Sequence, residues 1–145
     1  MPRRRPVQRV VLDTDVAVDY LDSARPAHRD AVDLLTALVA SDDELCLVAT
    51  SLKDVYYLLT RAANESSARR AVAALSEVMT ILPVDADTCA AALASGEPDF
   101  EDGLIRAGAE AAGADWIVTR DAAAFAGSTV PKADAAALLA RFRLG

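Results

Sequence analysis

Short apolar runs alternate along this chain with longer segments in which apolar residues recur every three to four positions. The short runs are bounded by polar residues and are too brief for helices, so they predict buried strands. The predicted strands cover residues 10–12, 45–49, 79–84 and 116–118, and a weaker extended segment near residues 129–130 is a candidate fifth strand.

The longer segments predict amphipathic helices. They cover residues 16–21, 26–41, 52–63, 66–78, 85–93, 98–112 and 134–141. Ser51 is a candidate cap for the third of these helices, and Gly113 follows the end of the sixth. Strands that alternate with helices and show no internal repeat predict an α/β fold, a three-layer α/β/α sandwich around a central parallel sheet of four to five strands.

The length of 145 residues fits one domain, which we place at residues 8–145. Residues 1–7 form a basic N-terminal tail in which three arginines stand between two prolines. The tail has two interpretations, contact with an RNA backbone and a solubilising extension.

The composition of the chain excludes several classes of protein. Hydrophobic residues make up 53% of the chain and the formal charge is −7, which argues against disorder and against a protein that coats DNA generically. No apolar run approaches the roughly 20 residues that span a bilayer, so we expect a cytoplasmic protein without a membrane association. Cys46 and Cys89 lie in apolar segments and are expected to be reduced thiols, and His28, the single histidine, is expected at the surface.

Carboxylates gather where the predicted strands end. Asp13 follows the first strand directly, and Asp121 follows the fourth after two residues. Asp54, Asp99 and Asp102 lie in the first turns of helices that begin near the same edge. Ligands of parallel sheets bind beyond the carboxyl ends of the strands, so we expect these five acids in one crevice.

Such a crevice requires cations, because each close pair of like charges costs about 4 kcal/mol at an effective dielectric constant of 20. Oxygen ligands without histidine or thiolate favour Mg²⁺ or Mn²⁺, and one or two such ions can hydrolyse a phosphodiester without a protein nucleophile. Each helix-start acid also has a simpler interpretation as an N-cap, whereas Asp13 and Asp121 fit that role less well. Asp15, Asp19 and Asp22 are expected to face solvent or to support the site.

These motifs resemble the PIN domain family, metal-dependent ribonucleases that include the VapC toxins of toxin-antitoxin systems. The first motif stands here as VVLDTDV, the second as ATSLKDVYYLL, and the third and last as DFEDGLIRAGAEAAGADWIVTRD. The resemblance covers nearly the whole chain after the tail. It implies that Asp13, Asp54, Asp102 and Asp121 are catalytic and bind metal, with Asp99 as a further metal ligand.

Three positions depart from the family pattern. Asp15 replaces the usual Asn, Asp54 is one methylene shorter than the usual Glu, and Ala124 stands where a further acid is common. These departures predict an altered or reduced metal site.

Other side chains near the acids have expected supporting roles. Thr14, Asp15, Ser51 and Thr119 are placed to hold carboxylates or metal-bound water. Arginines are expected to contact substrate phosphates, because guanidinium groups bind phosphate bidentately; the candidates are Arg120, Arg61 and Arg106, followed by Arg69 and Arg70. Tyr56 and Tyr57 are candidates for base stacking or a dimer interface, and Trp116 for the core or an interface.

The leading hypothesis is a Mg²⁺- or Mn²⁺-dependent endoribonuclease, the toxin of a VapBC-type pair. The resemblance also implies a cognate antitoxin and a homodimer. Two alternatives remain open. One is a non-catalytic PIN-like module that binds RNA or protein. The other is a haloacid-dehalogenase-type phosphatase, suggested by DTDV, although only Lys53 and Lys132 could supply the lysine that it needs.

Overall fold

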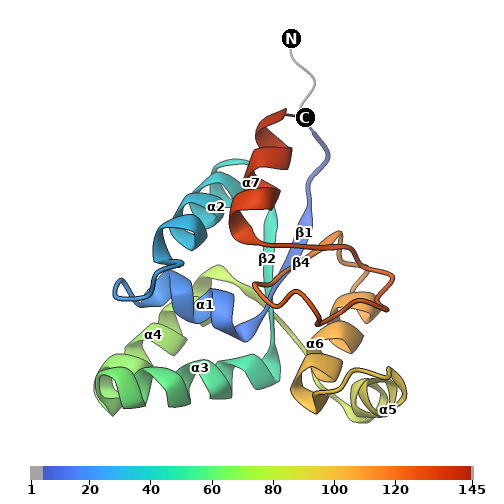
Figure 1. The fold of residues 1–145 in the computed structure, drawn as a ribbon. Coiled ribbons are helices and arrows are strands. Elements are labelled where there is room, and N and C mark those ends of the chain that lie inside the picture. The colour runs from blue at the N-terminus through green and yellow to red at the C-terminus, as the bar shows by residue number, and fades with distance from the viewer. Residues whose placement is uncertain (1–4, 145) are drawn as a thin grey trace.

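The structure of the protein is a computed structural model that describes residues 5–144 (Figure 1). The elements follow in the order β1 (Arg9–Leu12), α1 (Thr14–Leu21), α2 (His28–Ala40), β2 (Glu44–Val48), α3 (Ala49–Ala62), α4 (Glu65–Val78), β3 (Thr80–Leu82), α5 (Ala86–Ala94), α6 (Phe100–Ala111), β4 (Trp116–Val118), β5 (Lys132–Ala133) and α7 (Ala135–Leu144).

The strands form one parallel sheet in the order β3-β2-β1-β4-β5. β1 is central, and its Val11 is in register with Cys46 of β2 and with Ile117 of β4. These three residues are fully buried, as expected for a parallel sheet covered on both faces.

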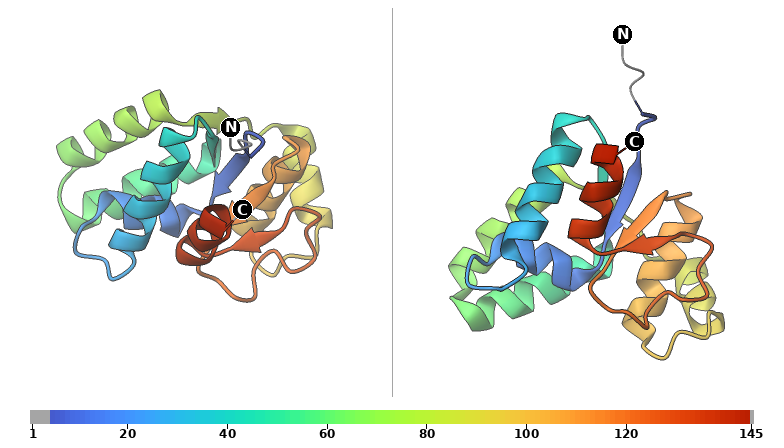
Figure 2. Two further views of the ribbon diagram at one scale, coloured as in Figure 1. Left: turned by 90° about the horizontal axis from the view of Figure 1, so that it is seen from above. Right: turned by 45° about the horizontal axis from the view of Figure 1, so that its top comes forward.

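Helices cover the sheet unequally (Figures 1 and 2). Val10 and Leu12 of β1 point into the larger core with α1, α2, α3, α4 and α7, whereas Val11 points into a core with α6. α5 packs on the outside of α6. At Gly108 a Cβ atom would lie 3.0 Å from Cγ2 of Val48, so glycine allows α6 to approach β2 closely. The predicted α/β/α architecture is therefore confirmed.

Two predicted boundaries were wrong. α3 begins at Ala49, after Val48 as its N-cap residue, so Ser51 lies inside the helix and does not cap it. The fifth strand is Lys132–Ala133 rather than residues 129–130, because the chain reaches β4 only after a loop that ends at Pro131. Both errors come from tertiary packing, which overrides the local pattern.

Most of the basic tail precedes the described residues. Its Arg5 is described, and it pairs with Asp43 at 2.8 Å (Nη1 to Oδ1) and lies 4.1 Å from the centre of the Phe142 ring. Both cysteines are free, and burial raises the pKa of the Cys46 thiol to about 12. His28 is half-buried rather than freely exposed, with Nδ1 2.8 Å from the carbonyl oxygen of Asp19. Within residues 5–144, no helix is long and apolar enough to cross a membrane.

Candidate active site

The candidate site lies where the order of strand addition in the sheet reverses. From β1 the chain builds outward through β2 and β3, and it later adds β4 and β5 on the other side of β1. Asp13 therefore leaves the central strand beside the residues that leave β4. A parallel sheet binds ligands at such a point, because the loops on either side diverge and leave a crevice.

Asp13 is fixed by hydrogen bonds on both carboxylate oxygens. Its Oδ1 accepts from the backbone N–H of Thr14 at 2.8 Å, and its Oδ2 accepts from Oγ1 of Thr119 at 2.8 Å. Asp13 is therefore the N-cap of α1, so the expectation that it fits a capping role poorly was wrong: the following short helix begins directly after it. The residue is 9% exposed. Burial raises the pKa of Asp13; the Thr119 hydrogen bond opposes this shift, and the charges of Asp15 and Asp121 add to it.

Thr119 joins Asp13 to Asp121. Its Oγ1 donates to Asp13 and also accepts from the backbone N–H of Asp121 at 3.0 Å. The exposed Asp121 carboxylate accepts through Oδ1 from the N–H groups of Ala123 at 2.8 Å and Ala124 at 3.1 Å, which lowers the pKa of Asp121. Thr119 itself does not line the crevice. It contacts the site through its hydrogen bonds with Asp13 and Asp121.

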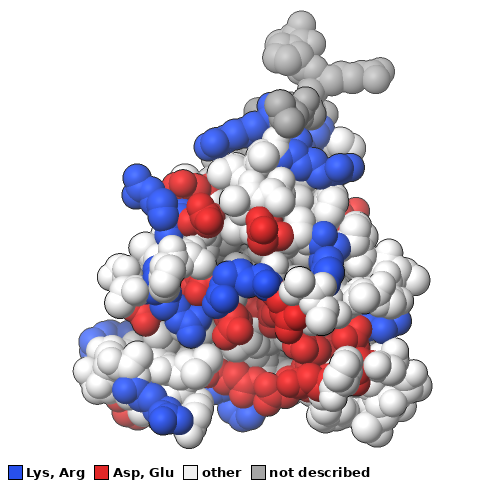
Figure 3. Space-filling model, viewed as in Figure 1, with Lys and Arg blue, Asp and Glu red and all other residues white. Residues whose placement is uncertain are grey.

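One pocket of about 320 Å³ holds the predicted acids. It is lined by Asp13, Thr14, Asp15, Asp54, Tyr57, Leu58, Asp99, Glu101, Asp102, Ile105 and Asp121. Figure 3 shows the corresponding hollow rimmed by Asp and Glu side chains. All five acids proposed as metal ligands contribute to it, from the ends of β1 and β4, from α3 and from the start of α6.

Asp54 lies in the second turn of α3, because the helix begins three residues earlier than expected. An N-cap role is therefore ruled out for it. Its Oδ1 lies 3.0 Å from Nζ of Lys53. Asp99 does have the simpler role, since it is the N-cap of α6 and its Oδ1 accepts from the N–H of Glu101 at 2.7 Å.

Asp102 has the most perturbed carboxyl of the pocket. Burial raises the pKa of Asp102 to about 7, and the charges of Asp13, Asp99, Asp121 and Glu97 add to that shift. A bound cation would lower the pKa of this carboxyl again, because it neutralises the surrounding negative charges and favours the ionised form.

Three further residues that we expect to support the site lie close to the acids. Oγ1 of Thr14 donates to Oγ of the buried Ser51 at 2.9 Å, which ties the start of α1 to the first turn of α3. Asp15 is exposed and lines the pocket. Ala124, in contrast, is buried and packs against the α6 side of the sheet.

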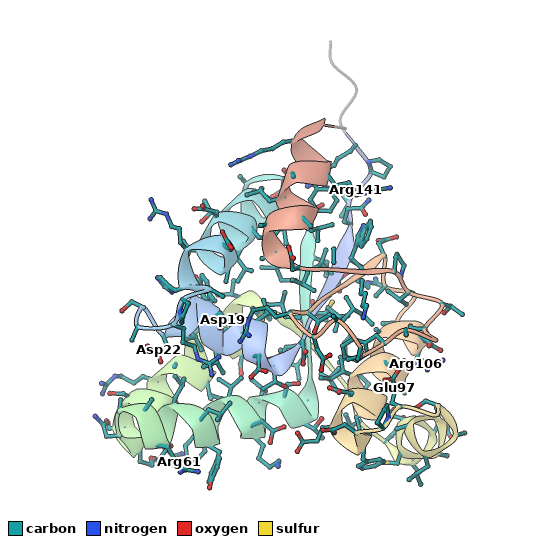
Figure 4. The ribbon with its side chains drawn as sticks, in the orientation of Figure 1. Asp19, Asp22, Arg61, Glu97, Arg106 and Arg141 are labelled. Carbon is teal, nitrogen blue, oxygen red and sulfur yellow. The ribbon has the colours of Figure 1, made fainter. Side chains whose placement is uncertain are left out.

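The arginines proposed to bind substrate do not line the pocket. Arg106 is held on the outer side of α6 by Glu97, Glu110 and two backbone carbonyls. Arg61 lies near the end of α3, with its guanidinium 5.6 Å from the centre of the Tyr57 ring. Arg120 stands next to Asp121 and pairs with Asp19. Figure 4 shows the positions of Arg61, Arg106 and Asp19.

Three acids were missed or misjudged in the sequence. Glu101 lines the pocket, and its neighbour Asp102 in the first turn of the helix could have revealed it. Glu97 lies in a loop, with its side chain 4% exposed, and no pattern in the sequence marks it. Asp19 does not face solvent, because its side chain is 2% exposed.

The donor chemistry of the pocket fits a hard divalent cation. The available ligands are carboxylate and hydroxyl oxygens, without histidine or thiolate, and such a set suits Mg²⁺ or Mn²⁺ rather than Zn²⁺. No three acidic, histidine or cysteine side chains among residues 5–144 are grouped tightly enough to form a ready cluster. Binding would therefore require the carboxylates to draw together or to act through water, as Mg²⁺ commonly allows.

The fold and this arrangement of acids define a class of protein. A family model described as PIN domain matches residues 9–123, and the chain belongs to this family. The search of proteins with curated descriptions found no match.

Solved structures with the same fold are toxins and toxin complexes. The toxin VapC20 of Mycobacterium tuberculosis, described as cleaving the sarcin-ricin loop, has a TM-score of 0.66 at 23% identity, over 79% of this chain and 91% of that one. FitAcB from Neisseria gonorrhoeae has a TM-score of 0.66 at 22% identity, over 87% and 97%. VapBC2 from Rickettsia felis, bound to DNA from its promoter, has a TM-score of 0.66 at 14% identity, over 86% and 97%.

Proposed function

We propose that this protein is a metal-dependent endoribonuclease that hydrolyses RNA phosphodiester bonds and is the toxin of a VapBC-type toxin-antitoxin pair. The observation that carries the proposal is the convergence of Asp13, Asp54, Asp102 and Asp121 on one pocket from four separate parts of the chain. Membership of the PIN family and the toxins among the solved neighbours support the same function.

In this proposal the four acids and Asp99 hold one or two Mg²⁺ or Mn²⁺ ions. When bound, such ions activate water and stabilise the leaving oxygen of a phosphodiester. The protein's own contribution is to fix the ligands. Thr119 orients the Asp13 carboxylate, and the contact of Thr14 with Ser51 holds the start of α1 against α3. No protein side chain is required as a covalent nucleophile.

Tyr57 supports RNA as the substrate. It lines the acidic pocket although it is 58% exposed, and Arg61 extends across its ring. Aromatic rings at such a position stack on the splayed bases of single-stranded RNA. We therefore assign Tyr57 to substrate contact, and Arg61 to positioning of that ring.

The proposed partner is a cognate antitoxin. Among the solved neighbours are a toxin-antitoxin complex from Klebsiella pneumoniae, with a TM-score of 0.63 at 21% identity, and the R. felis and N. gonorrhoeae structures described above. An antitoxin that offers a cation to the acidic pocket would compete with metal there. A homodimer is part of the proposal on the family resemblance.

The test is cleavage of total cellular RNA by purified protein with Mg²⁺, with Mn²⁺ and with chelator. Asp13→Asn and Asp121→Asn change the pocket, and Asp33→Asn on the exposed side of α2 is the matched control. We expect discrete products that require metal, that persist in the control and that are lost in both pocket variants. Loss in the pocket variants also excludes a contaminating ribonuclease.

Absence of metal-dependent cleavage on all RNA tested would contradict the nuclease proposal. Metal and RNA binding without cleavage would instead support a non-catalytic module, consistent with the short Asp54 side chain. An aspartyl-phosphate formed from a phosphate donor would support the phosphatase alternative. In the structure Nζ of Lys132 donates to the carbonyl oxygen of Ala122 at 2.7 Å, which does not favour it.

A further inference from the structure

Asp19 is a buried carboxylate that no sequence motif marks. It lies on α1, the helix that begins at Asp13, and its side chain is 2% exposed (Figure 4). Burial of an unpaired carboxylate is costly, so its retention depends on its partners.

Two arginines from different loops share this carboxylate. Nε of Arg120 donates to Oδ2 at 2.7 Å and its Nη2 donates to Oδ1 at 3.2 Å. Nη1 of Arg25 donates to Oδ1 at 3.1 Å. One negative charge therefore faces two positive charges, and the group keeps an excess positive charge. The geometry at Arg120 is bidentate, which fixes the plane of its guanidinium.

Arg120 is next in the chain to residues of the acidic pocket, although it does not itself line that pocket. It stands between Thr119, which holds Asp13, and Asp121, which lines the pocket. The charges of Asp13 and Asp15 contribute to the raised pKa of Arg120, although the pair with Asp19 is its largest cause. Figure 3 shows Lys and Arg side chains directly beside the Asp and Glu side chains at the centre of this face.

Part of the Arg120 guanidinium is free to bind an anion. Its side chain is 46% exposed, and within residues 5–144 its Nη1 has no hydrogen-bond partner. Arg120 lines a cavity of about 140 Å³, separate from the acidic pocket, together with Asp19, Asp30 and Asp134. In the described part of the chain neither Asp30 nor Asp134 is within ion-pair distance of Arg120.

We propose that Asp19 is a positioning residue that fixes Arg120 beside the acidic pocket, where Arg120 binds a phosphate of the RNA next to the one that is cleaved. This inference rests on the proposed nuclease function. Without Asp19, the flexible arginine would be drawn toward Asp13, Asp15 and Asp121, where it would compete with metal instead of meeting the substrate. An arginine side chain that is already fixed also loses less conformational entropy when it binds the phosphate.

The first test is the kinetics of RNA cleavage by Arg120→Ala. We expect KM to rise about tenfold and kcat to change by less than about twofold, since the lost contact is to a phosphate that does not react. The logarithmic dependence of RNA affinity on salt concentration should become shallower by about 0.7, the value of one phosphate contact on a single strand. Arg29→Ala, which removes an exposed arginine of α2, should leave both quantities unchanged.

The second test is a double-mutant cycle with Asp19→Asn. If Asp19 acts through Arg120, Asp19→Asn should raise KM in the wild-type background and have no effect on KM in Arg120→Ala. Thermal melting checks that each variant is folded. Should Asp19→Asn fail to fold, Arg120→Lys replaces it, because lysine keeps the charge and loses the bidentate contact; we expect an intermediate KM.

An unchanged KM and salt slope in Arg120→Ala, with wild-type cleavage intact, would overturn this inference and leave the nuclease proposal standing. Equal effects of Asp19→Asn in both backgrounds would overturn the positioning role. Absence of metal-dependent cleavage by the wild type would overturn the nuclease proposal, and the positioning inference with it.

Discussion

The hydroxyl of Thr119 and the carboxylate of Asp13 meet at 2.8 Å, although the two residues stand 106 positions apart in the chain. This contact is possible because β1 and β4 are neighbours in the sheet, with Leu12 opposite Val118. It joins the first and last motifs of the family in one buried pair. The site therefore depends on a contact that only the assembled sheet provides.

Thr119→Val should damage both stability and metal binding. Valine has nearly the same shape, but it removes the donor to Asp13 and the acceptor for the N–H of Asp121. We expect the free energy of unfolding to fall by about 1–3 kcal/mol and the affinity for Mn²⁺ to fall by about 10–100-fold. Urea denaturation and calorimetric titration measure the two effects. Thr119→Ser keeps the hydroxyl, so a similar loss in that variant would count against the explanation.

Asp102 should make the metal-free protein less stable as the pH rises. Its pKa is about 7 in the folded state against an ordinary value of 3.8, so between these values the folded state binds more protons than the unfolded state. Stability then decreases with pH and levels off above pH 7. Burial shifts the pKa of Asp13 in the same direction. Groups with lowered pKa values, such as Asp121, change the stability only in more acidic solution, where they become protonated.

The measurement is the melting temperature in chelator at several pH values between about 5 and 8. We expect it to fall with pH in the wild type and to fall less in Asp102→Asn, which should be the more stable protein at neutral pH. Mg²⁺ should raise the melting temperature of the wild type more than that of the variant, because the ion binds the folded state. Parallel pH profiles for the two proteins would refute this account.

Asp54→Glu should tighten metal binding. The side chain gains one methylene, so its carboxylate should extend further into the pocket from the second turn of α3. The carboxylate would then lie further into the pocket than the present contact of Asp54 with Lys53. Asp54→Asn keeps the length but removes the charge, and we expect it to weaken Mn²⁺ binding by about tenfold or more. Titration with Mn²⁺ measures the affinities of the wild type and of the two variants, which we expect to decrease in the order Asp54→Glu, wild type, Asp54→Asn. Equal affinity of wild type and Asp54→Asn would mean that Asp54 holds no ion.

Arg106→Gln should reduce stability without changing substrate affinity. The arginine donates to Glu97, to Glu110 and to the carbonyl of Gly127, and Glu97 is almost fully buried. Its loss leaves a buried carboxylate unpaired, at a cost of about 3 kcal/mol or more. Arg69→Gln, which breaks an exposed pair with Glu65, should cost less than about 1 kcal/mol. A raised KM for RNA in Arg106→Gln would restore its assignment to substrate binding.

The buried ion pairs show where sequence analysis fails. Asp19 occurs in a short helix among other acids, and its neighbours in the sequence suggest exposure. Its partner Arg120 is 101 positions away and meets it because β1 and β4, which precede the two residues, are neighbouring strands. Charge on a side chain predicts exposure, and a partner that is distant in the sequence leaves no local pattern. The second partner, Arg25, is six positions away in a loop, where no helical spacing marks the pair.

The sequence by itself determined the fold class and the location of the acids. Short apolar strands that alternate with amphipathic helices predict a covered parallel sheet, and the sequence places Asp13 directly after one strand and Asp121 two residues after another. Only the assembled fold sets the order of the strands, the hydrogen bonds that Thr119 makes to Asp13 and Asp121, and the pairing of the buried Asp19 with Arg120. The spacing of apolar residues reflects a single helix or strand and can be seen in the sequence. Contacts between side chains of different elements depend on which elements become neighbours, which the spacing does not show.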